Sequence, residues 1–183
     1  LFLALQAPVA VPGVSVMNLL RTAYQEVHSD PTKLEDTTQN PALARRWRAS
    51  DISLSDFIAK VKGYAKELRV ADSFLERGIH DGFSGGEKKK IEMLQALVLA
   101  PKVAIFDEID TGLDVDALKV VAKGISLLKK QGTACIIITH YQRILQYVTP
   151  DVVHVLVAGK LVKTGKATLA KQIEKEGYAK YLS

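Results

Sequence analysis

The chain has 183 residues, a length suited to one domain or two small lobes. Lys and Arg number 25 and Asp and Glu number 20, which gives a formal net charge of +5. This mild basicity, without a long basic tract, gives no reason to expect a nucleic-acid partner. The single cysteine excludes an internal disulfide and a multi-cysteine zinc cluster, and no apolar run is long enough to insert in a membrane.

The first residues are strand-like. Residues 1–5 predict a short buried strand, and no positively charged region precedes them as in a signal peptide. We therefore interpret them as the middle of a strand in a fragment of a longer protein. Residues 6–14 contain Pro8, Pro12 and Gly13 and predict a turn-rich stretch.

Helices are predicted on either side of a polar segment. Ser15 precedes apolar residues at helical spacing, from Val16 to Val27, which indicates an amphipathic helix. Residues 29–50 are polar and lack a sustained period, so they predict a loop or insertion, with one helical turn near residues 42–47. Ser53 and Asp56 have the spacing of a capping box and begin the next helix.

The second half of the chain alternates between strands and helices. Residues 103–106 and 134–139 are continuous apolar runs, and a helical segment at residues 116–130 lies between them. Two such strands joined by a helix predict an α/β fold with a parallel sheet covered on both faces. Further elements follow: a hairpin formed by residues 152–157 and 160–163, and a final helix at residues 167–176.

Two acidic residues follow the first of these strands. Asp107 and Glu108 come directly after residues 103–106, and ligands of parallel sheets bind beyond the carboxyl ends of the strands. We expect Asp107 to hold magnesium, through water, and Glu108 to orient or deprotonate an attacking water. The alternative is a strand that simply ends in polar residues.

A glycine-containing helix start gives a second signal. Ser84, Gly85, Gly86 and Glu87 have capping-box spacing and begin a helix that continues to about Leu99. The free N–H groups of such a start, the positive end of the helix dipole and the two glycines suit a phosphate group. The alternative is an ordinary helix cap without a ligand.

Three weaker signals lie elsewhere. His140 follows the strand at residues 134–139, although a lone histidine is more often structural. Gln6 follows the first strand. Asp114, in the stretch of residues 111–114, is either functional or only a helix N-cap.

The order of these motifs resembles that of the ATP-binding-cassette (ABC) ATPases. Gln6 resembles the Q-loop of that family and His140 its H-loop. Residues 84–87, 103–108 and 111–114 are similar to its signature motif, Walker B strand and D-loop. The resemblance implies an incomplete nucleotide-binding domain: residues 1–14 as strand and Q-loop, residues 15–100 as a helical subdomain, and residues 101–183 as the Walker B, D-loop and H-loop part.

The resemblance also implies ATP and Mg²⁺ as ligands and a head-to-tail dimer that forms when ATP binds. It assigns catalytic roles to Glu108 and His140 and the metal to Asp107 and Gln6. The expected nucleotide-binding residues are Gln6, Ser84, Gly85, Gly86, Glu87 and Asp114. The family's Walker A loop belongs upstream of Gln6, and the glycines of residues 159–166 have the wrong spacing for it. We therefore expect the segment by itself to be inactive.

Finer features are similar to the SufC group, the ABC ATPases of the SUF iron–sulphur cluster assembly system. They lie at residues 8–15, 82–89, 112–118 and 139–143, with departures at Ile109 and Thr111. The resemblance implies SufB and SufD as partners and a location in the cytoplasm or plastid stroma. Two alternatives stay open: the nucleotide-binding subunit of an ABC importer, and a truncated, non-enzymatic partner subunit.

The single cysteine and a run of three lysines are interpreted without reference to a ligand. Cys135 lies inside an apolar strand and is predicted to be an inert core thiol. Lys88, Lys89 and Lys90 follow the signature motif on its helix, so some of them should face solvent. One of the three could also approach Glu108 and hold it in a resting position.

Overall fold

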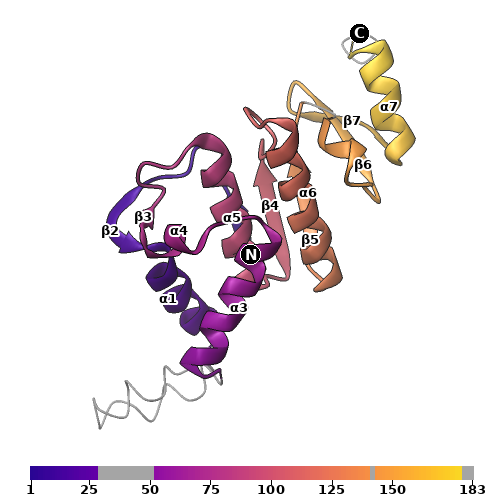
Figure 1. Ribbon diagram of the computed structural model, residues 1–183. Coiled ribbons are helices and arrows are strands. Elements are labelled where there is room, and N and C mark those ends of the chain that lie inside the picture. The colour runs from indigo at the N-terminus through magenta and orange to yellow at the C-terminus, as the bar shows by residue number, and fades with distance from the viewer. Residues whose placement is uncertain (29–51, 141–142, 179–183) are drawn as a thin grey trace.

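The structure is a computed structural model that describes residues 1–28, 52–140 and 143–178. It has three parts in space: a group of helices, a small parallel sheet with a helix beside it, and a hairpin with a C-terminal helix at the far end (Figure 1). The predicted loop at residues 29–50, with its helical turn, lies outside the described residues.

The parallel sheet is the framework of the molecule. It has the order β1-β4-β5, with β1 at Phe2–Ala4, β4 at Val103–Asp107 and β5 at Ala134–Ile138. Both pairings are parallel, with Ala4 opposite Phe106 and Asp107 opposite Ile138. The predicted parallel α/β sheet is therefore confirmed, and the carboxyl ends of its three strands lie at one edge.

The prediction that this sheet is covered on both faces is wrong for the described residues. Ala104 and Phe106 are fully buried on one face. On the other face Leu3 is 52% exposed and Ile136 and Ile138 are each 51% exposed. Successive side chains of a strand point to opposite faces, so an apolar run alone does not show that both faces are covered.

The predicted helix starts are confirmed by their caps. Helix α3 (Leu54–Glu67) begins at Ser53, whose hydroxyl oxygen accepts a hydrogen bond from the N–H of Asp56 at 3.1 Å. Helix α5 (Gly85–Leu99) begins at Ser84, and helix α6 (Val115–Lys130) begins at Asp114. Helix α7 (Ala167–Glu176) has its predicted bounds. The side-chain oxygens of Ser53, Ser84 and Asp114 satisfy N–H groups that the helix itself leaves unpaired.

The turn-rich stretch predicted for residues 6–14 contains a strand. Strand β2 (Val11–Ser15) pairs antiparallel with the short β3 (Gly78–Ile79), with an irregular register between Val11 and Ser15. A strand that includes Pro12 is tolerated because β2 is an edge strand, where the missing N–H breaks no continuous ladder. Helix α1 (Val16–His28) follows β2 and contacts both strands, and helix α4 (Asp72–Glu76), which contacts α1, precedes β3.

Helix α5 is central to the core. It contacts α1 and α3 on one side and α6 on the other. Its contact with α6 includes Gly124, where an added Cβ atom would lie 2.2 Å from Cγ of Met93. The absent side chain therefore lets the two helices approach closely. The largest fully buried residues of this core are Phe106, Leu20, Leu68, Leu75, Ile91, Met93, Leu94, Leu97, Ile109, Leu118, Leu128 and Ile144.

The C-terminal part has its own small core. Strands β6 (Val153–Val157) and β7 (Lys160–Gly165) form an antiparallel hairpin, against which α7 packs. A short 3-10 helix, η3 (Arg143–Gln146), precedes them. Residues 159–166 therefore belong to a hairpin and are not a phosphate loop, as predicted. Among the residues that the structure describes, no helix is long and apolar enough to cross a membrane.

Candidate active site at the carboxyl edge of the sheet

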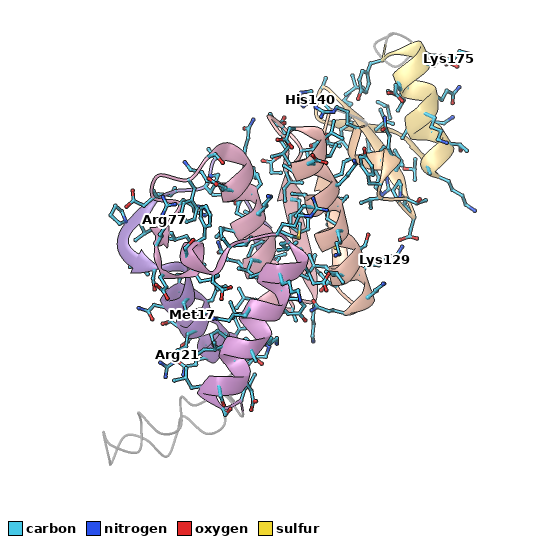
Figure 2. All side chains as sticks on the ribbon, viewed as in Figure 1. Met17, Arg21, Arg77, Lys129, His140 and Lys175 are labelled. Carbon is cyan, nitrogen blue, oxygen red and sulfur yellow. The ribbon has the colours of Figure 1, made fainter. Side chains whose placement is uncertain are left out.

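Three predicted site residues meet where the parallel strands end. Gln6, Glu108 and His140 follow β1, β4 and β5 respectively, and Figure 2 shows His140 at this edge. Nε2 of Gln6 donates a hydrogen bond to Oε2 of Glu108 at 2.6 Å. Nδ1 of His140 lies 3.2 Å from Oε1 of the same carboxylate. The strands thus bring together residues that are far apart in the sequence and place a nitrogen at each oxygen of Glu108.

The backbone of Glu108 is in an unusual conformation. Its φ of 47° is in the left-handed region, which non-glycine residues seldom adopt. Its N–H donates to the carbonyl of Ile138 at 2.9 Å, and its carbonyl accepts from the N–H of Thr111 at 3.1 Å. The strand ladder therefore continues through Glu108 before the chain turns away. The side chain keeps 25% exposure, so water reaches a carboxylate that two nitrogens orient.

The carboxylate and amide oxygens at this edge of the sheet are of the kind that bind magnesium when a nucleotide supplies its other ligands. Among the described residues no group of three or more His, Cys, Asp or Glu could hold a metal by itself. Magnesium typically takes one or two carboxylates and completes its shell with phosphate oxygens and water. Asp107 ends β4 and supplies a carboxylate. The amide nitrogen of Gln6 donates a hydrogen bond to Glu108, so the amide oxygen of Gln6 is the atom that can bind a cation.

The predicted signature residues form a second group. The Oγ atom of Ser84 accepts from the N–H of Glu87 at 3.3 Å, and the Glu87 carboxylate accepts from the N–H of Ser84 at 2.7 Å. This N–H donor lowers the pKa of Glu87 below its ordinary value. Glu87 therefore has a structural task in the cap. The N–H groups of Gly85 and Gly86 lie in the first turn, where a helix leaves N–H groups for a ligand or water.

The start of α5 lies beside the start of α6. An added Cβ atom at Gly86 would be 3.6 Å from Cβ of Ala117 and 3.9 Å from Cδ2 of Leu113. Asp114 caps α6 by accepting a hydrogen bond from the N–H of Ala117 at 2.7 Å. The structure therefore places the start of α6, which Asp114 caps, beside Gly86, and the N-cap role that the sequence offered as the alternative is the one that its contacts show.

Sequence reasoning missed Arg77, which shapes the loop before the signature helix. Its Nη2 donates to the carbonyls of Asp81 at 3.0 Å and Gly82 at 3.2 Å. Its guanidinium lies over the rings of Phe74 and Phe83, at 5.1 Å and 4.7 Å from their centroids. The aromatic residue directly before Ser84 is a weak sequence signal for such stacking.

A buried histidine in the same loop was also missed. His80 is 5% exposed and packs edge-on against Phe83. Burial, with smaller contributions from the charges of Lys88 and Lys89, lowers the pKa of His80 to about 4. The imidazole is therefore neutral at physiological pH and functions as part of the packing.

Asp110 is a third residue that sequence reasoning missed. It is 3% exposed, and its Oδ2 accepts a hydrogen bond from Oγ1 of Thr139 at 2.9 Å. Arg143 donates from Nη2 to the carbonyl of Leu113 at 3.2 Å. These bonds connect the turn after Glu108 to the segment around His140, so they support the geometry at the sheet edge. The sequence signal that could have identified Asp110 is its position as a third acidic residue shortly after Asp107 and Glu108.

The expectation that a lysine approaches Glu108 is not met by Lys89. This residue is 6% exposed, and its Nζ donates to the carbonyls of Leu5 at 2.9 Å and Gln6 at 3.0 Å. Gln6 and His140 contact the Glu108 carboxylate instead.

Cys135 is partly buried and burial raises the pKa of its thiol, in agreement with the inert role predicted for it.

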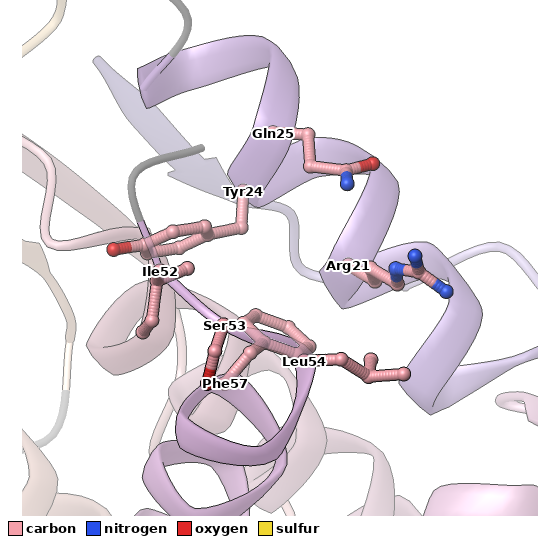
Figure 3. Close-up of a pocket in the computed structure, with 7 residues that line it drawn as sticks. All are labelled: Arg21, Tyr24, Gln25, Ile52, Ser53, Leu54 and Phe57. Atoms are coloured by element: carbon pink, nitrogen blue, oxygen red, sulfur yellow. The ribbon is translucent and has the colours of Figure 1, made fainter. Parts of the chain in front are cut away.

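A pocket of about 250 Å³ lies between α1 and the start of α3 (Figure 3). It is lined by Arg21, Tyr24, Gln25, Ile52, Ser53, Leu54 and Phe57. Lys60 lies over the ring of Tyr24 at 4.6 Å from its centroid. The pocket contains none of the predicted site residues, and we assign it no part in the chemistry.

Comparison with known proteins agrees with the motif order, although no protein-family model matches the chain. The chain is 45% identical over 178 residues to vegetative protein 296 of Bacillus subtilis (strain 168), covering 97% of the chain and 61% of that relative. It is 44% identical over 179 residues to a "Probable ABC transporter ATP-binding protein" of Streptococcus pyogenes serotype M3, covering 98% and 63%. It is 43% identical over 178 residues to the "Probable ATP-dependent transporter ycf16" of Pyropia yezoensis, covering 97% and 64%.

Solved structures show the same fold. An ATP-binding subunit of an ABC transporter matches with a TM-score of 0.65 and 21% identity, over 96% of this chain and 62% of that one. A bacterial ABC transporter cassette, solved as a dimer, matches with a TM-score of 0.64 and 13% identity, over 90% and 62%. The chain spans between 61% and 64% of the length of the relatives named above. It therefore has the α/β fold of an ABC ATPase nucleotide-binding domain, of which it covers part, and its sequence relatives include ABC-type ATP-binding proteins.

Proposed function

We propose that the natural full-length protein is an ABC-type ATPase that uses the carboxyl edge of this sheet to hydrolyse ATP. One observation carries the proposal: the Glu108 carboxylate, partly exposed at the end of β4, has Gln6 at one oxygen and His140 at the other. An oriented carboxylate that water can reach is suited to act as a general base. The fold and the relatives supply the class of substrate.

Each predicted site residue receives a role in this proposal. Glu108 accepts a proton from the attacking water, and His140 and Gln6 hold its carboxylate in position. Asp107 and the amide oxygen of Gln6 would hold Mg²⁺, which would supply positive charge against the phosphates of ATP. The proposed domain division is the one stated above: strand and Q-loop, helical subdomain, and the remaining part of the ATPase core.

The signature residues serve a second copy of the protein in this proposal. The N–H groups of Gly85 and Gly86 and the hydroxyl of Ser84 bind the phosphates of ATP that the partner holds, and Glu87 maintains the cap. Asp114 lies beside them and contributes to the same interface. An ATP-dependent head-to-tail dimer follows from this arrangement. Its support is the position of these groups at the adjacent starts of α5 and α6 and the dimer described for the bacterial transporter cassette.

We further propose that the ATPase cycle drives conformational change in an iron–sulphur cluster assembly scaffold, with SufB and SufD as partners. The support is the sequence resemblance around residues 82–89 and 139–143. Such a protein would operate in the cytoplasm or the plastid stroma. A transporter subunit is the second candidate, favoured by the printed names of two relatives. Affinity purification from the native source separates the candidates: recovery of SufB and SufD supports the first, and recovery of a membrane permease supports the second.

The ATPase proposal is tested with Glu108→Gln in the natural full-length protein. The substitution removes the proton acceptor but keeps the size of the side chain, and general bases contribute about 10²–10⁴-fold to rate. We expect kcat to fall by at least about 100-fold while ATP binding, measured by calorimetry, stays within a few-fold. Glu76→Gln, which changes an exposed residue at the end of α4, is the matched control. Unchanged turnover by a folded Glu108→Gln protein would show that another group is the base.

A further inference from the structure

Lys89 is buried at an unexpected place on the signature helix. It lies in the second turn of α5 with 6% exposure. Its Nζ donates to the carbonyl oxygens of Leu5 at 2.9 Å and Gln6 at 3.0 Å, and lies 3.2 Å from Oε2 of Glu92. Two of the three N–H donors of the ammonium group therefore go to main-chain carbonyls, and Glu92 lies at ion-pair distance.

The ion pair with Glu92 does not by itself explain why a lysine is here. Glu92 is 5% exposed, and burial raises its pKa above the ordinary value. Buried ion pairs of this kind stabilise a protein little and are often replaceable by apolar residues without loss. The contacts to the main chain of Leu5 and Gln6 are the ones that apolar residues could not reproduce.

Those contacts connect the signature helix to the proposed base. Lys89 holds the carbonyl of Gln6, and the side chain of the same Gln6 donates to Oε2 of Glu108 at 2.6 Å. A continuous path therefore runs from α5, which begins at Ser84, through Lys89 and Gln6 to the Glu108 carboxylate. Leu5 and Gln6 follow the short strand β1, and their carbonyls lie beyond its ladder.

We propose that Lys89 is a positioning residue that links the signature helix to Gln6, so that a displacement of α5 is transmitted to the Glu108 carboxylate. Glu92 orients the ammonium group for this purpose. The proposal rests on the ATPase function proposed above and deepens it. In a dimer whose signature residues meet a partner's nucleotide, contact at Ser84 would then adjust the base in the same chain.

The test uses a variant that removes the link without leaving a buried charge. Lys89→Met alone would leave Glu92 unpaired, and an uncompensated buried charge can unfold a protein. The double variant Lys89→Met/Glu92→Gln removes both charges and keeps the side-chain volumes similar. Lys90→Met, one position along the same helix and only partly buried, is the matched control for the loss of a lysine.

Kinetics of the natural full-length protein give the first readout. We expect the double variant to lower kcat about tenfold with KM for ATP changed less than about twofold, since misplacing a catalytic group by a fraction of an ångström lowers rate more than binding. Gln6→Ala should lower kcat at least as much, because it removes both the hydrogen bond to Glu108 and the amide oxygen proposed to hold Mg²⁺. Because Lys89 acts through Gln6, the triple variant should be no slower than Gln6→Ala alone. Additive effects, or an unchanged kcat in the double variant, would overturn the proposal.

Hydrogen exchange of the nucleotide-free protein gives a second readout that does not depend on catalysis. Amides of residues 5–7 should exchange faster in Lys89→Met/Glu92→Gln than in the natural protein and in Lys90→Met, because the main chain of Leu5 and Gln6 loses its anchor. Equal exchange in all three proteins would overturn the link. If the natural protein hydrolysed no ATP, the proposed function would fail while this exchange result would still decide the link.

Discussion

Substitution of Gly124 by alanine tests the close approach of α5 and α6, which sets the signature residues beside Asp114. The added Cβ atom would lie 2.2 Å from Cγ and 2.6 Å from Sδ of Met93, and 3.3 Å from Cδ2 of Leu68. Carbon atoms in contact prefer about 3.5–4.0 Å, so Met93 or the helix must move by more than an ångström. Met93 and Leu68 are fully buried, which leaves no solvent for the displaced side chain.

The expected magnitude follows from two opposing terms. Overpacking a core costs about 1–3 kcal/mol, and the short distance to the middle of a methionine side chain places this site at the upper end. Alanine regains about 1 kcal/mol over glycine through helix propensity. We therefore expect Gly124→Ala to lower the free energy of unfolding by about 1–2 kcal/mol.

The matched control is Gly63→Ala in α3. Among the described residues, nothing outside the neighbouring backbone of α3 lies within 4 Å of a Cβ atom built at Gly63. This variant should gain about 0.5–1 kcal/mol, because only the propensity term operates. The free energies of unfolding of the two variants, measured by urea denaturation, should therefore differ by about 1.5–3 kcal/mol. Adding Met93→Ala should make Gly124→Ala less costly than in the natural background. If Gly124→Ala is as stable as Gly63→Ala, the packing argument is refuted.

Two further predictions concern the loop and helix start at the signature motif. His80→Gln should make the free energy of unfolding depend less on pH in acid. The pKa of His80 falls from 6.5 to about 4 on folding, because the folded protein buries the neutral ring. The stability that this neutral ring provides is therefore complete above pH 6.5 and is lost as pH falls from 6.5 toward 4. Across that window denaturant titrations should show the natural protein losing up to roughly 3 kcal/mol relative to the variant, and parallel curves would contradict the buried neutral ring. Ser84→Arg should prevent the ATP-dependent dimer while ATP binding by each monomer persists, because a bulky cation would occupy the phosphate-facing helix start. Sedimentation velocity measures the dimer, and a dimer that still forms with ATP would contradict the role given to the signature motif.

Local sequence signals predicted the helices well. Ser53, Ser84 and Asp114 each precede a helix in the structure at the position where a side-chain cap was expected. Gly177 follows the last helix, as predicted. These signals are reliable because a cap satisfies backbone groups within a few residues, so its energetics depend little on the rest of the fold.

The sequence predicted less well which segments form strands and which faces of the parallel sheet are buried. The two long apolar runs became β4 and β5, but β2 was missed because Pro12 and Gly13 argue for a turn. Strand β2 exists through its pairing with β3, which lies more than 60 residues later in the chain. The exposed face of the sheet was missed for a related reason, since an apolar run does not specify what covers it.

The sequence by itself determined the site residues as separate candidates and the order in which they occur. It could not determine that Gln6 and His140 would contact the same carboxylate, because that contact depends on the parallel register of three strands distant in the chain. It also could not distinguish Lys89 from Lys88 and Lys90, which are chemically identical neighbours. Only the packing of α5 against the end of β1 decided which lysine is buried, because one helical position in the run faces the carbonyls of Leu5 and Gln6.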